Sequence, residues 1–168
     1  MLQPVLEMEK ILQDQKDIYC EIYFIEEKKS EAILNKNGML LEQLSRDQEQ
    51  KLHSVELLEK NREKQIEKYI LLNNISDLPQ RPTLQDIIHS MDEDSSHHLM
   101  RLGMELKRLL NKLKHLRETN NTLIQDNLDF YNILLSGLRN ENSIDSGYGN
   151  DGKEDMKVSN PVLFNQTA

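Results

Sequence analysis

The 168-residue chain lacks several features on which common functional classes depend. It contains one cysteine, Cys20, and no tryptophan, and only 5% of its residues are aromatic. A single cysteine excludes an intramolecular disulfide and a zinc site built from paired thiolates, so we expect Cys20 to be an inert, partly buried thiol. The low aromatic content, together with 30% charged residues, is typical of long solvated helices and argues against a deep catalytic pocket.

Long hydrophobic runs and an excess of basic residues are also missing. No stretch approaches the roughly 18 apolar residues of a membrane span, and Glu7, Glu9 and Lys10 interrupt the N-terminal segment before a secretory apolar core develops. The net charge of -8 disfavours nucleic-acid binding, which needs clustered cations. We therefore expect a cytoplasmic protein that binds no nucleic acid and does not insert into a membrane.

The few glycines and prolines, six and four, mark the ends of the predicted helices. The apolar periodicity between them predicts helices over about 5–34, 39–73, 84–91 and 92–139, with a reversal of the chain at 35–38. Thr83 and Asp86 form a predicted capping box, and Asp92 places negative charge at the start of the last helix. The predicted fold is all-α: an elongated antiparallel bundle of three long coiled-coil-like helices and a short connecting helix, over 1–139, followed by a flexible acidic tail, 140–168.

Polar residues interrupt the apolar seams of the second and third long helices. In the second helix, Arg62 either reaches Glu59 or another chain's carboxylate or, as we expect, lies on a solvated edge. In the third, Asn120 and Asn127 occupy seam positions, where they either fix the alignment of the helices or mark a loosely packed, wet stretch.

Candidate catalytic and metal-binding groups are sparse. His97 follows Asp94 at the i, i+3 spacing used in bundled di-metal sites, but no second copy of this pair exists in a plausible register. His98, Arg101 and Gly103 only approximate a phosphotransfer histidine motif. We therefore predict no enzymatic activity, no metal and no cofactor, and we interpret these histidines as part of a solvated helix start.

A basic run lies beside the leucine seam of the last helix, and its members are Lys107, Arg108, Lys112, Lys114 and Arg117. An anionic lipid or RNA is a conceivable ligand. We expect instead that these cations face the glutamates of the first two long helices, or water.

The end of the last helix carries more apolar residues than one neighbouring helix can bury. A second stripe at alternating spacings of four and three runs beside Leu123, Phe130 and Leu134, and it consists of Ile124, Leu128, Tyr131, Leu135 and Leu138. The helix is also longer than its predicted partners. The pattern predicts a docking surface for a partner's amphipathic helix, unless a bent first helix or a homodimer covers the stripe.

Two sequence segments carry a family resemblance. The stretch Leu116-Arg117-Glu118-Thr119-Asn120-Asn121-Thr122-Leu123-Ile124, continuing through Phe130-Tyr131-Asn132-Ile133-Leu134-Leu135, resembles the C-terminal helix of FlgN-type flagellar export chaperones. Tyr148-Gly149-Asn150-Asp151-Gly152 resembles the Tyr-Gly-x-x-Gly element that follows that helix in the family.

The resemblance implies an all-helical cytoplasmic chaperone that binds the C-terminal helices of hook-filament junction proteins and escorts them to the flagellar type III export gate. By this resemblance we expect client contact at the second stripe, with Leu123 and Phe130 supporting it from the bundle side. The alternative is a coiled-coil structural or adaptor protein in which the stripe is a permanent homo-oligomer interface.

Overall fold

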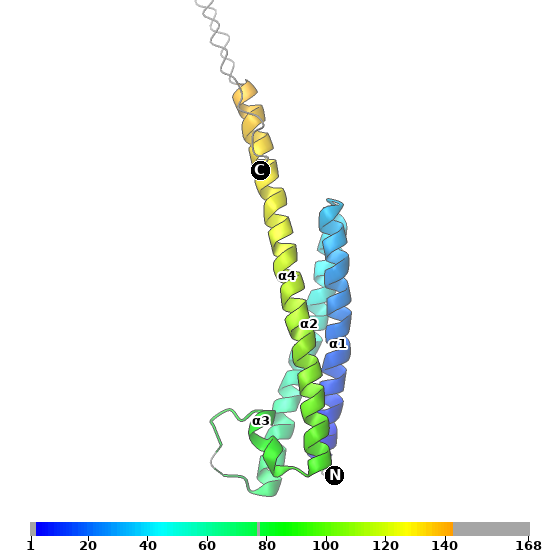
Figure 1. The fold of residues 1–168 in the computed structure, drawn as a ribbon, viewed down its shortest axis with the longest axis vertical. Helices are drawn as coiled ribbons and strands as arrows, with labels where there is room; N and C mark the ends of the chain where they lie inside the picture. The colour runs from blue at the N-terminus through cyan, green and yellow to red at the C-terminus, as the bar shows by residue number, and fades with distance from the viewer. Residues whose placement is uncertain (1–2, 77, 143–168) are drawn as a thin grey trace, which may run out of the picture. The chain divides into compact units, whose positions relative to one another are not determined.

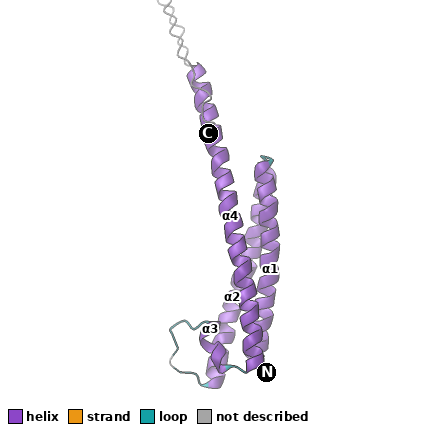
Figure 2. Ribbon diagram, viewed as in Figure 1, coloured by secondary structure: helices purple, strands orange, loops and turns teal. Residues whose placement is uncertain are grey.

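The computed structural model describes residues 3–76 and 78–142, and every regular element within them is helical (Figures 1 and 2). The elements, in chain order, are α1 (Gln3–Leu34), α2 (Gly38–Asn73), α3 (Leu84–Ile87), the 3₁₀ helix η1 (Ile88–Ser90) and α4 (Glu93–Asn142). The predicted all-α class and the three predicted long helices are therefore confirmed. The predicted short helix is a single α-helical turn that continues as a 3₁₀ turn.

The turn between α1 and α2 reverses the chain within three residues, so that the two helices lie side by side and antiparallel (Figure 1). The Asn37 N–H donates to the Ala32 carbonyl oxygen at 2.8 Å, and the Asn37 side chain accepts from the Leu40 N–H at 3.1 Å. Lys36 adopts the left-handed conformation, with φ of 54°, whereas Gly38 is the first residue of α2. The turn thus uses a lysine where a glycine would be less strained.

The connection from α2 to α4 is held by side-chain caps. Asn74 ends α2 in the left-handed conformation, with φ of 49°. The backbone N–H and the hydroxyl of Thr83 both donate to Asp86 Oδ2 at 2.7 Å, and the predicted capping box between these two residues is confirmed. Asp92 accepts from the Ser95 N–H at 3.0 Å and from the Ser95 hydroxyl at 2.7 Å, so that a carboxylate satisfies free donors at the start of α4.

The largest apolar cluster joins α1, α2, α4 and the segment α3–η1. Its buried members are Val5, Met8, Leu12, Ile66, Tyr69, Ile87, Ile88, Leu99 and Leu102. The Tyr69 hydroxyl donates to the Ser90 carbonyl oxygen at 3.0 Å and ties η1 to α2. A second cluster takes one residue from each long helix, namely Ile22, Val55 and Leu113. Among the described side chains of α4, Leu113 is the last buried apolar one.

Arg62 does not lie on a solvated edge, contrary to our expectation. Its side chain is 18% exposed, and it donates two hydrogen bonds to the Glu59 carboxylate, one of them from Nε at 2.9 Å. Gln15, which is buried on α1, donates to the same carboxylate at 3.1 Å. The polar interruption in the α2 seam is therefore a satisfied cluster that links α1 to α2.

The chain divides into two units, Met1–Asp129 and Phe130–Ala168, and the division falls within α4. The clusters described above belong to the first unit. The predicted boundary between residues 139 and 140 stays a prediction, and the predicted acidic tail lies almost wholly outside the described residues. No helix in the described ranges is both long enough and apolar enough to cross a bilayer.

Candidate functional site

One face of α4 changes from buried to exposed along the helix. Residues that alternate at spacings of three and four share a helix face. On this face, Leu99, Leu102 and Leu113 are at most 6% exposed, and Leu123 and Ile124 are half-buried. Farther along, the exposed side chains are Leu128 (52%), Tyr131 (43%), Leu134 (49%) and Leu135 (53%). The leucine spacing thus continues along α4 beyond the point at which its residues are buried.

The structure shows some of the predicted binding residues exposed and others half-buried, and the side chain of one is not described. Leu128, Tyr131 and Leu135 of the second stripe are exposed, and Ile124 is half-buried. Phe130 was expected to support the stripe from the bundle side, and it is 54% exposed. Its ring packs edge-on against that of Tyr131, with centroids 5.9 Å apart. Leu138 belongs to α4, but its side chain lies outside the described set.

Near the end of α4, two further apolar residues are exposed but were not among the predicted binding residues. Leu134 is 49% exposed, although its spacing is that of the leucine seam, and Ile133 is 69% exposed. The lengths of the helices could have indicated that Leu134 is not buried. Because α1 has 32 residues and α2 has 36, neither can line all 50 residues of α4, so seam residues near its end cannot be assumed buried.

A buried polar layer lies between the last buried leucine of α4 and the exposed apolar residues. Asn120 is 1% exposed, and its amide donates to the backbone oxygen of Glu26 at 3.0 Å and to Glu26 Oε1 at 2.9 Å. Gln48 of α2 donates to Glu26 Oε2 at 2.7 Å, and Ser30 donates to Asn120 Oδ1 at 2.6 Å. The alignment role considered for Asn120 is thereby supported, since a shift of α4 along α1 would break several of these bonds.

The Glu26 carboxylate is the charged centre of this layer and is 2% exposed. Its burial acts to raise the pKa, but hydrogen bonds from Asn120 and Gln48 and the nearby charge of Lys29 outweigh this effect and lower the pKa below its ordinary value. Lys29 Nζ lies 3.3 Å from Glu26 Oε2 and donates to Gln48 Oε1 at 2.9 Å. The carboxylate is therefore ionised and satisfied inside the first unit.

The groups considered for chemistry are not brought together. Cys20 is exposed, which corrects the expectation of a partly buried thiol. His98 lies 3.0 Å from an Arg101 nitrogen, within its own helix. Across the described part of the chain, no group of three or more His, Cys, Asp or Glu side chains is placed to hold a metal ion.

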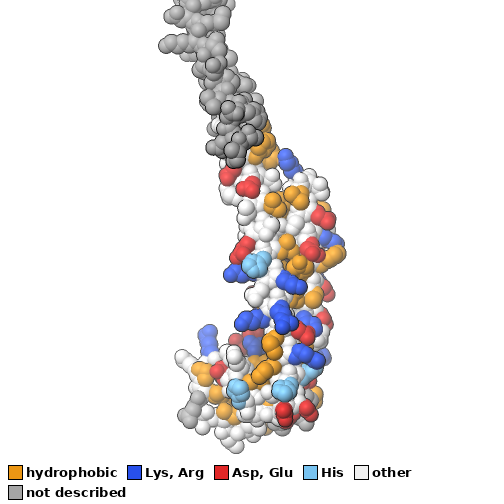
Figure 3. Space-filling view, in the orientation of Figure 1, with side chains coloured by type: hydrophobic (Ala, Val, Ile, Leu, Met, Phe, Trp, Pro, Cys, Tyr) orange, Lys and Arg blue, Asp and Glu red, His pale blue; other side chains and the backbone are white. Residues whose placement is uncertain are grey.

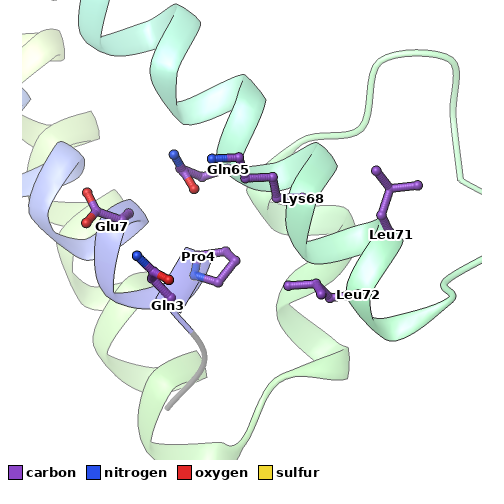
Figure 4. A pocket seen from close by; sticks show the side chains of 7 residues that line it. All are labelled: Gln3, Pro4, Glu7, Gln65, Lys68, Leu71 and Leu72. Atoms are coloured by element: carbon purple, nitrogen blue, oxygen red, sulfur yellow. The ribbon is translucent and has the colours of Figure 1, made fainter.

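A groove of about 720 Å³ lies between the N-terminal end of α1 and the C-terminal end of α2 (Figure 4). Its lining consists of Gln3, Pro4, Glu7, Gln65, Lys68, Leu71 and Leu72. One carboxylate and one ammonium group among neutral side chains do not make a convergent reactive set. The exposed apolar end of α4 is therefore the stronger candidate site.

A comparison with known protein families gave a match over most of the chain. A family model described as FlgN protein matches residues 5–155, a range that includes α2, α4, α1 except for its first two residues, and every predicted binding residue. Searches of curated proteins and of solved structures gave no match. Because the family match extends over most of the chain, this protein belongs to the FlgN family of flagellar export chaperones.

Proposed function

We propose that this chaperone binds the amphipathic C-terminal helices of flagellar hook-filament junction proteins through the apolar end of α4. The observation that supports this proposal most directly is the exposure of Leu128, Tyr131 and Leu135, which lie at helical spacing and are each about half exposed. Ile124, Leu123, Phe130 and Leu138 complete the proposed surface. An amphipathic helix is a suitable occupant because its own apolar stripe has the same spacing.

Burial of these side chains supplies the binding energy. Complete burial of a leucine stabilises by roughly 1.5 to 3 kcal/mol, and half-exposed residues gain a part of this on binding. A client helix covered in this way cannot polymerise through the same stripe. The chaperone thus prevents premature assembly in the cytoplasm and delivers its client to the export gate without a nucleotide or a metal.

The test is a pair of charge insertions with a matched control. We expect Leu128→Asp/Leu135→Asp to weaken binding of a junction-protein C-terminal peptide by at least about a hundredfold, because two carboxylates would be desolvated in the interface. Isothermal titration calorimetry measures the affinity, and circular dichroism checks that helicity is retained.

Ser136→Asp provides the control. Ser136 is exposed, and it lies roughly 100° around the helix from Leu135 and roughly 120° from Phe130, outside the proposed surface. Its substitution should change the affinity less than about threefold. Equal losses in the control and in the double variant would refute a face-specific site.

A coiled-coil adaptor that self-associates through the same face is the second candidate, and the same exposed side chains favour it. Light scattering on dilution distinguishes the two proposals. An obligate oligomer keeps its molar mass on dilution. A chaperone that self-associates through this surface should instead dissociate when the client peptide is added and bind the peptide.

A further inference from the structure

The exposed side chains of α4 between His97 and Arg117 carry a concentration of positive charge. Between His97 and Arg117 there are six basic residues and one acidic residue, Glu105. The segment therefore has a net charge of +5 within a chain of -8, so the remaining residues carry -13. All six cations are exposed, namely Arg101, Lys107, Arg108, Lys112, Lys114 and Arg117. Figure 3 shows Lys and Arg side chains gathered on the face along which α4 runs.

These cations are exposed and face water rather than the glutamates of α1 and α2, which is one of the two environments that we expected for them. Glu105 forms a salt bridge with Lys16 of α1 at 2.8 Å, and the charges of Arg101 and Arg108 on its own helix act on it more weakly. Lys114 lies 3.9 Å from Glu118 of its own helix. The other four members of the basic run form no salt bridge with a carboxylate in the described part of the chain. The positive charge is thus available to a partner.

Apolar side chains accompany the charge. Met100 is 39% exposed and Met104 is 53% exposed, one helical turn apart. Lys107 and Arg108 follow one turn later, and Lys112 one turn after Arg108. Since each residue adds 1.5 Å, residues 100–112 make a strip of roughly 18 Å on which flexible thioethers precede several cations. We call this strip the basic methionine face.

We propose that the basic methionine face docks an acidic amphipathic segment of a partner protein, at a site distinct from the client surface. Carboxylates of such a segment complement the unpaired cations, and its apolar residues cover Met100 and Met104. Phosphate-bearing partners fit less well. The -13 on the rest of the chain opposes approach to RNA or an anionic bilayer. The residues that carry the proposed contact, Met100, Met104, Lys107, Arg108 and Lys112, include no aromatic ring for base stacking and no Leu, Ile or Phe of the kind that interfacial helices insert.

The test uses the full chain and two labelled synthetic helical peptides. One carries leucines at helical spacing with glutamates elsewhere, and the other has glutamine in place of each glutamate. Fluorescence anisotropy should give at least about tenfold tighter binding of the glutamate peptide at low salt, with the difference shrinking as salt rises.

Charge reversal locates the binding. Arg108→Glu/Lys112→Glu should weaken the glutamate peptide by at least about tenfold, whereas Lys64→Glu/Lys68→Glu, an equal charge change at exposed positions of α2, should weaken it less than about threefold. Met104→Gln should weaken it by about threefold while leaving every charge in place. Binding of a junction-protein peptide should be unchanged in all three variants, which separates this site from the client surface.

Three outcomes would overturn the proposal. The first is an equal loss in the α2 and α4 double variants, which would indicate only a long-range charge effect. The second is equal binding of the two peptides by the unmodified chain. The third is tighter binding to polyuridylate RNA, or to vesicles with about 30% phosphatidylserine, than to the glutamate peptide.

Discussion

The two parts of α4 on either side of residues 121–127 share a sequence pattern and differ in environment. Upstream, Leu99, Leu102 and Leu113 are at most 6% exposed, whereas downstream Leu128, Leu134 and Leu135 are 49 to 53% exposed. Both sets consist of leucines at helical spacing. The difference teaches that periodicity identifies the apolar face of a helix and does not identify what covers it. In a chaperone, the uncovered part of such a face is where a client can bind.

The largest expected contrast is in stability. Leu99→Ala removes a fully buried side chain from the main cluster and should lower the free energy of unfolding by about 2 to 5 kcal/mol. Leu134→Ala, at a half-exposed position of the same helix, should lower it by less than about 1 kcal/mol. Urea unfolding followed by circular dichroism measures both. Similar losses would mean that Leu134 is buried in solution and that the contrast between the two parts of α4 is wrong.

The buried polar layer should contribute an intermediate effect. Asn120→Leu removes two hydrogen bonds to Glu26 and leaves its buried carboxylate short of donors, so we expect a loss of about 1 to 3 kcal/mol despite the added apolar volume. Asn127→Leu is the control, because Asn127 is half-buried at a seam position seven residues farther along α4. It should change the free energy of unfolding by less than about 0.5 kcal/mol. A stabilising Asn120→Leu would contradict a structural role for the layer.

The smallest predicted effect is a pH dependence. The pKa of Glu26 is lower in the folded chain than in the unfolded one, so the carboxylate stabilises the fold above its unfolded pKa, and this contribution disappears as the pH falls through the folded pKa. Glu26→Gln should therefore be less stable than the parent near neutral pH. The difference in the free energy of unfolding between the two should become smaller below about pH 4.5.

Urea unfolding at several pH values measures this difference. Asp126→Asn, at an exposed position of α4, is the control for the loss of one negative charge. A difference that stays constant with pH would show that folding does not lower the pKa of Glu26.

Much of the fold could be predicted because its signals are local. Helix periodicity and the Thr83 and Asp92 caps act within a few residues, and they placed the starts of α2, α3 and α4 within one residue. The second apolar stripe likewise identified Leu128, Tyr131 and Leu135 before their exposure was known. Leu134 was missed because its spacing is the same as that of a buried seam residue.

The polar residues were harder to predict, since their partners lie far along the chain. Asn120 bonds to a residue 94 positions away, and Gln48 to one 22 positions away. The basic run was expected to face either glutamates of the first two long helices or water, and its members are exposed. In the described part of the chain, only Glu118, on the same helix, forms a salt bridge with one of them. Spacing along a single helix carries no information about which groups a neighbouring helix presents.

Local sequence determined where the helices begin and end, which face of each is apolar, and that α4 is longer than α1 and α2, because these properties depend on residues within a turn or two of one another. Only the tertiary structure decided that Glu26, Gln48 and Asn120 form one buried layer, and that the apolar face of α4 is covered at Leu113 and open at Leu128. It also decided that the basic residues between Arg101 and Arg117 form no salt bridge with a described carboxylate of another helix. These outcomes depend on which distant segments pack together, and a side chain is buried only where another segment displaces its water.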